Sequence, residues 1–295
     1  MRPRVELFRL RFNGTRVRFK VYTPADGNVL RRAAFVTSPI GDAESWDALC
    51  RILAGQGCLC VAFELPGFGH TPVDAPQDNA TRSAILWGVL DEVEISRGDP
   101  PSKWHLVSHG SGCAVILEMT RTQPDGVASR TLISPVTHRF TTSLSRSFVS
   151  GRLGRWLYTK AYEYRAGSIK RFGAKLYKLY GERLTDERVY NLHREFYREG
   201  RTETLFELFA KGYRLPEKAY RVAAPIMLIW GKNDPFGPRP DERLLKSLPD
   251  TEVHYITSAH MSMETMPQEI SEYLKGWFEF AEGRMKTPHK QKRQY

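Results

Sequence analysis

Short, uninterrupted apolar runs, each followed by a segment with helical spacing, constrain the fold of this chain more than any other feature. The runs lie at 33–37, 58–63, 104–107, 131–134, 226–230 and 252–256. Segments with helical spacing lie at 46–54, 81–95, 111–120 and 269–280, and Leu244 and Leu245 indicate one more. Because a strand buried on both faces is apolar throughout, we expect an α/β fold with a mostly parallel central sheet flanked by helices.

The first strands follow a different pattern. Residues 5–12 and 15–23 alternate apolar and polar side chains on either side of Asn13-Gly14. This dipeptide is a strong signal for a two-residue type I′ turn, so we expect an antiparallel hairpin at the amino end of the sheet.

The strand–helix alternation stops between Pro135 and Pro225. Apolar residues share helical faces in this interval: Ile169, Phe172, Leu176 and Leu179; Val189, Leu192 and Phe196; Leu205, Leu208 and Phe209. We interpret residues 137–220 as an inserted helical cap, residues 1–136 and 221–282 as the core, and residues 283–295 as a basic C-terminal tail.

The positive charge of the chain gathers in the insertion. The net charge is +11, and residues 139–218 hold 18 Lys and Arg against 9 Asp and Glu. A charged segment is usually a solvated surface, but this concentration favours an anionic partner.

The sequence also bears on location and metals. No apolar run has the roughly 20 residues that span a membrane, and no signal-peptide core follows the basic N-terminus, so we expect a cytoplasmic protein. The four cysteines include Cys58 and Cys60 but no second pair or histidine cluster, so we expect buried reduced thiols and no metal site.

One motif between a buried strand and a helix points to a known family. Residues 106–113 carry Ser108, His109, Gly110, Ser111 and Gly112. They resemble the nucleophile elbow of the α/β-hydrolase fold superfamily, a sharp turn with small residues two positions before and after the nucleophile. Gly110 then occupies the nucleophile position. Centring the elbow on Ser111 instead would put His109 where only a small side chain fits.

Further motifs resemble the same family in the same chain order. Residues 228–235 look like the loop that carries the catalytic acid, here Asp234, and residues 258–261 look like the histidine loop, here His260. Residues 63–71 are similar to the family's strand-four loop. Ser38-Pro39 stands where the oxyanion loop usually has His-Gly. The resemblance implies a central sheet with an inserted cap, His260 as general base and Asp234 as its orienting partner.

The departures from the family pattern limit the chemistry. Gly110 has no side chain to form an acyl-enzyme, while the Ser111 N–H remains a possible oxyanion donor. The pocket should be floored by Gly110 and edged by His260 and by Ser38-Pro39. Cys113 is a weak candidate for a substitute nucleophile, because it should turn into the helix–sheet packing.

Three interpretations of Gly110 stay open. The chain is an enzyme that acts on an ester, thioester, lactone or related carbonyl substrate by hydrolase-like or lyase-like His–Asp base chemistry. Alternatively, it is a non-catalytic relative that binds an apolar or acyl ligand or a partner. In the third, glycine is an engineered replacement of a catalytic serine.

The resemblance implies no cofactor, and the partners follow from the cap. Between 146 and 178, Lys and Arg residues interleave with Trp and Tyr. These side chains could simply cover the pocket, recognise an anionic carbonyl substrate, or contact anionic membrane lipid peripherally. No nucleic-acid recognition motif is present, and the sequence does not indicate an oligomeric state.

Overall fold

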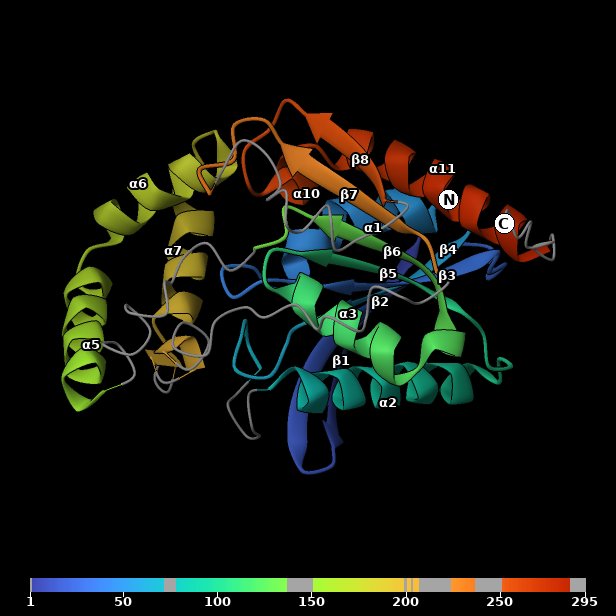
Figure 1. The fold of residues 1–295 in the computed structure, drawn as a ribbon, viewed down its shortest axis with the longest axis horizontal. Coiled ribbons are helices and arrows are strands. Elements are labelled where there is room, and N and C mark those ends of the chain that lie inside the picture. The colour runs from blue at the N-terminus through green and yellow to red at the C-terminus, as the bar shows by residue number, and fades with distance from the viewer. Residues whose placement is uncertain are drawn as a thin grey trace, which may run out of the picture.

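A computed structural model describes residues 2–71, 78–136, 151–198, 201–202, 204–206, 224–236 and 251–286. Its centre is an eight-stranded sheet in the order β1-β2-β4-β3-β5-β6-β7-β8 (Figure 1). The strands are β1 (Arg4–Phe12), β2 (Thr15–Thr23), β3 (Arg31–Val36), β4 (Cys58–Phe63), β5 (Trp104–His109), β6 (Val127–Ile133), β7 (Ile226–Gly231) and β8 (Thr251–Ile256). β2 pairs antiparallel with β1 and with β4. The remaining neighbours in this order, from β4 and β3 to β7 and β8, pair in parallel. The predicted mostly parallel sheet is confirmed.

The N-terminal hairpin turns at the predicted dipeptide. Asn13 and Gly14 have φ angles of 47° and 82°, as the two central residues of a type I′ turn require. The turn sets the register that pairs Phe12 with Thr15 and Arg4 with Thr23.

Helices cover both faces of the sheet. The core helices are α1 (Asp47–Ala54), which follows a 3₁₀ turn at Ala43–Trp46, α2 (Asn79–Arg97), α3 (Gly112–Thr122), α10 (Ser262–Thr265) and α11 (Pro267–Lys286); a second 3₁₀ turn lies at Pro124–Gly126. Side chains of α2 and α3 join one buried apolar cluster, and side chains of α1 and α11 join the other (Figure 1). Because both faces are buried, the parallel strands have the continuous apolar sequences seen above.

Three further helices lie beside the sheet, at the left of Figure 1: α5 (Arg152–Ala166), α6 (Ile169–Tyr180) and α7 (Asp186–Phe196). We call them the cap helices. They fall within the predicted insertion, and the two faces predicted around Phe172 and Leu192 form α6 and α7. The predictions for Leu208, Phe209, Leu244 and Leu245 lie outside the described residues.

The C-terminal boundary differs from the expectation. α11 continues to Lys286, so the helix extends into the segment expected to be a tail from 283. The residues from 280 onward include the helix formers Ala281, Glu282, Met285 and Lys286, which allow the helix to propagate.

All four cysteines are buried and free, as expected for reduced thiols. Among the described helices, none combines the length and the apolar character that crossing a membrane requires.

Candidate active site

The turn after β5 has the geometry expected for the elbow centred on Gly110. Gly110 has a φ of 57°, in the left-handed region, whereas Ser111 has ordinary helical angles and begins α3. Gly112 must lack a side chain, since a Cβ there would lie 2.8 Å from the carbonyl oxygens of Val36 and Thr37. The backbone therefore turns sharply at residue 110, and residue 112 is the position that has no room for a side chain.

His260 and Asp234 come together from the loops after β8 and β7. His260 Nδ1 lies 2.8 Å from Asp234 Oδ2, and the other carboxylate oxygen accepts the Phe236 N–H at 2.8 Å. Both side chains are buried. Because Nδ1 faces a carboxylate, it carries the hydrogen, and Nε2 presents its lone pair.

That lone pair lies beside the elbow. A Cβ built on Gly110 would lie 3.6 Å from His260 Nε2. The structure thus brings Gly110, Asp234 and His260 into one site.

A second histidine, His109, lies in the site, and no role was predicted for it. His109 is completely buried, and its ring contacts that of His260 with centroids 4.5 Å apart. His109 Nε2 lies 3.1 Å from the backbone carbonyl oxygen of His260, and Nδ1 lies 3.2 Å from Ser38 Oγ. No local sequence pattern predicts these contacts, because both partners lie far away in the chain.

The contacts of His109 fix the direction of the Ser38 hydroxyl. A carbonyl only accepts, so Nε2 of His109 donates to it and Nδ1 is the acceptor. The Ser38 O–H therefore donates to Nδ1, and Oγ presents lone pairs to the Gly110 side. Oγ also lies 3.6 Å from the point where a Gly110 Cβ would be. Two acceptors, Ser38 Oγ and His260 Nε2, thus flank the same point.

The tautomer of His109 is stable because the ring stays neutral. Burial, assisted by the neighbouring His260, holds the pKa of His109 well below its usual value. Proton transfer from Ser38 to His109 would charge a buried ring, so Ser38 is suited to accept hydrogen bonds rather than to act as a nucleophile.

The buried neutral ring predicts acid sensitivity of folding. The unfolded chain takes up a proton on His109 below about pH 6.5 and the folded chain does not, so stability is complete above that pH and falls below it by about 1.4 kcal/mol per pH unit. His105, whose pKa burial also lowers, contributes in the same direction. We expect His109→Gln, which can keep both hydrogen bonds, to reduce the slope by about one proton, as measured by urea unfolding between about pH 7 and pH 5. Equal slopes for the two proteins would contradict this assignment.

Of the residues predicted around the oxyanion position, Ser111 alone offers a suitable donor. The Ser38 hydroxyl donates to His109, and Pro39 has no amide hydrogen. Ser111 is the N-cap of α3, where the first N–H groups have no partner inside the helix. Its N–H thus has no partner inside the helix and stays the predicted oxyanion donor near Gly110.

Cys113 is turned away from this chemistry. Its Sγ lies 3.9 Å from the Ile133 carbonyl oxygen, inside the packing of α3 on the sheet. Burial raises the pKa of the thiol to about 12, so no useful thiolate forms near neutral pH.

A cavity of about 350 Å³ lies between the cap helices and the site loops. Its lining is mostly apolar and includes Ile40, Tyr158, Phe172, Phe196, Pro235 and Phe236, with Lys175 and Lys178 among the other lining residues. Phe236 also packs edge-on against the His260 ring, with centroids 4.7 Å apart. The cavity therefore approaches the site through Ile40 and Pro235, which are close in the chain to Ser38 and Asp234. Its lining differs from the predicted pocket, because it includes neither Gly110 as the floor nor His260 and Ser38-Pro39 as the edge; Phe236, which packs on His260, lines it instead.

An arginine joins the cap helices to both site loops. Arg188 of α7 contacts Asp42 Oδ2 at 2.9 Å and Glu264 Oε2 at 3.2 Å. Asp42 follows the Ser38 segment and Glu264 follows His260. Tyr180 donates to Glu264 at 2.8 Å. The position of the cap is thus tied to the loops that carry the site.

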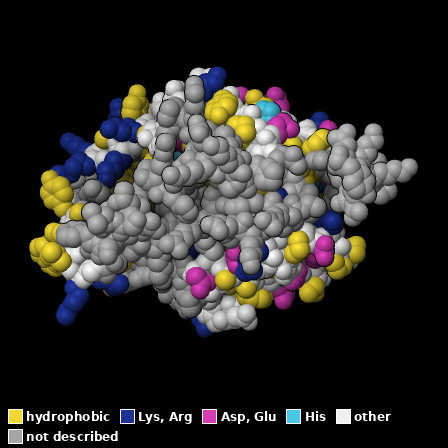
Figure 2. Space-filling model, in the orientation of Figure 1, with side chains coloured by type: hydrophobic (Ala, Val, Ile, Leu, Met, Phe, Trp, Pro, Cys, Tyr) yellow, Lys and Arg dark blue, Asp and Glu magenta, His cyan; other side chains and the backbone are white. Residues whose placement is uncertain are grey.

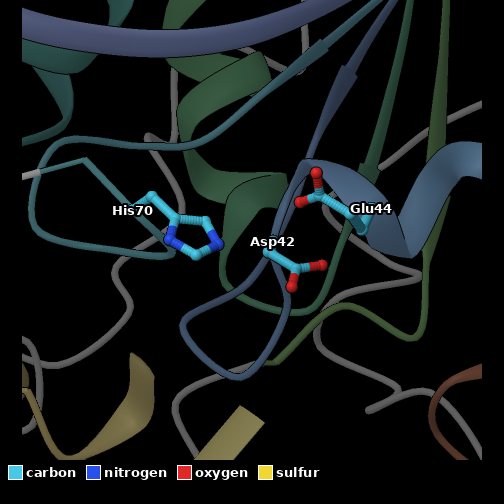
Figure 3. A group of neighbouring side chains, drawn as sticks. All are labelled: Asp42, Glu44 and His70. Carbon is cyan, nitrogen blue, oxygen red and sulfur yellow. The ribbon is translucent and has the colours of Figure 1, made fainter. Parts of the chain in front are cut away.

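Figure 3 shows a group with the chemistry of metal ligands: Asp42, Glu44 and His70, whose ligand atoms lie within 4.8 Å of one another. Arg188 already neutralises Asp42, and Arg18 binds Glu44 at 2.6 Å. A cation would have to displace both guanidinium groups, so the group is better explained as part of an ion-pair network.

The strand order, the elbow after β5 and the acid and histidine after β7 and β8 define the class of an α/β-hydrolase fold. The sequence profile of the Alpha/beta hydrolase family matches residues 35–273, and the chain belongs to this family. No curated protein matches it significantly.

Solved structures with the same fold carry diverse activities. An epoxide hydrolase, CorEH, has a TM-score of 0.73 at 14% identity over 94% of this chain and 99% of that one. A membrane phospholipase A described as a bacterial virulence factor has a TM-score of 0.72 at 16% identity, covering 94% and 87%. A haloalkane dehalogenase variant from Bradyrhizobium elkanii has a TM-score of 0.71 at 15% identity, covering 97% and 100%. At these identities the similarity shows the fold alone.

Proposed function

We propose that this chain is a hydrolase-like or lyase-like enzyme that uses His260 as a general base and needs no serine nucleophile. One observation carries the proposal: Nε2 of His260 lies 3.6 Å from the position of a Gly110 Cβ, while Asp234 holds the opposite ring nitrogen at 2.8 Å. An imidazole oriented by a carboxylate suits proton removal from water or from substrate.

In the hydrolytic form, a water held beside Gly110, beyond the position of an added Cβ, donates one hydrogen bond to His260 Nε2 and the other to Ser38 Oγ. Its lone pairs then face the cavity side, ready to attack a carbonyl carbon. As the new C–O bond forms, His260 takes the proton and the Ser111 N–H receives the developing oxyanion. Collapse of the intermediate expels the alkoxide or thiolate, which takes the proton back from His260.

The substrate class follows from the cavity and the family. An apolar lining of Phe, Tyr and Leu side chains suits the acyl or alkyl part of an ester, thioester, lactone or related carbonyl compound. Lys175 and Lys178 support an anionic group on the same molecule. The reaction as written uses neither a metal nor an organic cofactor and no nucleic acid. A cytoplasmic location and the division into a core (1–136, 221–282), a cap (137–220) and a tail remain part of this proposal.

The second candidate is a non-catalytic member of the family that binds an apolar or acyl ligand or a protein partner. Gly110 favours it, because the side chain that normally attacks the substrate is missing. The same cavity would then serve binding alone.

The test compares variants on a series of p-nitrophenyl esters of increasing chain length. We expect His260→Ala to lower kcat by about 10²-fold, the lower range for loss of a general base. Asp234→Asn should also lower kcat, because the amide favours the wrong tautomer of His260. Ser38→Ala should lower kcat by about tenfold with KM unchanged, because one hydrogen of the water loses its acceptor.

Two controls make the result specific. His254→Ala removes a histidine on β8 outside the site, and Ser129→Ala removes a buried serine whose Oγ lies 2.8 Å from His105 Nδ1. Both should leave kcat unchanged. If the unaltered chain hydrolyses none of the esters, or if His260→Ala retains its rate, the binding function is the better explanation.

A further inference from the structure

Helix α5 has apolar side chains on its outer surface as well as its inner one. Leu153, Trp156 and Leu157 are 59%, 56% and 43% exposed. Their spacing of three and four residues places them on one helical face, and Tyr164, also exposed, continues the same stripe. A surface helix normally turns such a stripe toward the core.

The inner face of α5 is already occupied. Tyr158, Ala161 and Tyr162 line the cavity, and Tyr162 donates a hydrogen bond to the Phe196 carbonyl oxygen at 2.5 Å. Tyr164 contacts α6 through Arg171, whose guanidinium carbon lies 4.2 Å from the ring centroid, whereas Leu153, Trp156 and Leu157 leave large apolar surfaces in water.

Basic side chains surround this stripe. Residues 152–180, which span α5 and α6, hold eight Lys and Arg and one acidic residue, Glu163. Arg152, Lys160 and Lys170 are exposed. Figure 2 shows Lys and Arg interleaved with hydrophobic side chains at the left end of the molecule, where Figure 1 places α5 and α6.

We propose that the outer face of α5, with the adjoining surface of α6, docks on a bilayer that contains anionic phospholipid. Trp and Leu side chains enter the boundary between headgroups and acyl chains, and Lys and Arg pair with the anionic headgroups. Lys160 lies within the apolar stripe, and its long stem lets the ammonium group reach the headgroups while the neighbours insert.

The same observations disfavour the other occupants of this surface. Nucleic acid would use the charge but would leave Leu153 and Leu157 without a role. A second copy of this chain would bring two strongly basic surfaces together. An anionic bilayer is complementary to both the charge and the apolar stripe.

Docking in this orientation would also serve the cavity. Lys175 and Lys178 of α6 line it, together with Tyr158 and Ala161 of α5, so the docked helices would form its wall. The docking proposal nevertheless needs no catalytic activity, and the failure of one proposal leaves the other standing.

The first experiment is sedimentation of the whole chain with vesicles. One set consists of phosphatidylcholine, and in the other a third of the lipid is phosphatidylglycerol. We expect sedimentation with the anionic vesicles, little with phosphatidylcholine, and release by high salt, which screens the headgroup charges. Equal sedimentation with both vesicles, or with neither, would overturn the proposal.

Variants then distinguish the insertion of apolar side chains from the electrostatic attraction to headgroups. Leu153→Ser with Trp156→Ser should weaken binding at least about tenfold, and Lys160→Gln with Lys170→Gln by a similar factor. Ile95→Ser is the matched control, because Ile95 is 70% exposed on α2, away from the cap. All are surface substitutions, and thermal unfolding checks that each variant folds. If Leu153→Ser with Trp156→Ser has no effect while the lysine variant does, the surface binds anions without inserting, and the proposal fails.

Tryptophan fluorescence gives a test on the unaltered protein. Of the six tryptophans, Trp46, Trp87, Trp104, Trp230 and Trp277 are buried, and Trp156 is exposed. Quenching by acrylamide therefore reports mainly on Trp156. We expect anionic vesicles to protect it and phosphatidylcholine vesicles not to. Unchanged quenching on binding, or protection by self-association without vesicles, would rule out insertion of α5.

Discussion

Gly110→Ser is expected to react stoichiometrically with a fluorophosphonate and to hydrolyse short aryl esters at least about 10²-fold faster than the unaltered chain. A Cβ at residue 110 would lie 3.6 Å from His260 Nε2, so the hydroxyl that it carries can reach this nitrogen. Asp234 already holds the other side of the ring. The substitution would supply the one missing part of a serine–histidine–aspartate arrangement.

The new side chain has a structural cost. Residue 110 has a φ of 57°, where a non-glycine residue is strained by about 1–3 kcal/mol. The added Cβ would also lie 3.0 Å from Ser38 Cβ, so Ser38 must shift by a few tenths of an ångström. We therefore expect a lower melting temperature together with the gained reactivity.

Gly98→Ser is the matched control for this experiment. Gly98 also has a positive φ, 67°, at the end of α2, and no other group lies within 4 Å of an added Cβ. It should show the backbone strain without any labelling. Mass spectrometry of the labelled peptide locates the adduct. A folded Gly110→Ser that takes up no label would show that the elbow and His260 are not aligned for catalysis.

Arg188→Met is expected to destabilise the chain by about 3 kcal/mol, because it leaves two largely buried carboxylates without their shared partner. The side chains of Asp42 and Glu264 are only 7% and 16% exposed. Burial alone would raise the pKa of Asp42, but the charge and hydrogen bonds of Arg188 outweigh it and hold this pKa below its usual value. Removing the arginine takes away this stabilisation of the ionised form and leaves burial to raise the pKa of Asp42.

Urea unfolding measures the loss, and limited proteolysis shows whether the cap helices become accessible first. Arg194→Met is the control on the same helix. Arg194 is mostly exposed and pairs with its neighbour Glu195, so its loss should cost less than about 0.5 kcal/mol. Equal effects for the two variants would show that Arg188 does not hold the cap. Arg188→Lys should be intermediate, since one ammonium cannot bridge both acids as a guanidinium does.

Much of the fold was predictable because its signals are local. β2 and β4 were predicted with their observed ends, and the other strands and α1, α2 and α3 to within a few residues, whereas α10 was not predicted. The buried parallel strands were found because burial on two faces requires an uninterrupted apolar run. Asn13-Gly14 predicted its turn because only residues that tolerate positive φ fit there. The boundary of α11 was less accurate, since a helix end depends on capping and solvent rather than on a change of pattern.

The site was predictable only in part. Asp234, His260 and Gly110 follow from motif positions, and the structure places them together. The role of His109 could not be read from the sequence, because it depends on a hydroxyl 71 residues before it and a carbonyl 151 residues after it. The bridge from Arg188 to Asp42 and Glu264 could not be predicted from the sequence for the same reason.

Residue type and spacing along the chain were enough to predict the sheet, the turn at residue 110, the lack of a nucleophilic side chain there and the basic character of the insertion. Tertiary structure alone decided which way the Ser38 hydroxyl points, which atoms flank Gly110, and that α5 turns Trp156 outward. These properties depend on distances between segments far apart in the chain, and such distances are set only when the whole core packs.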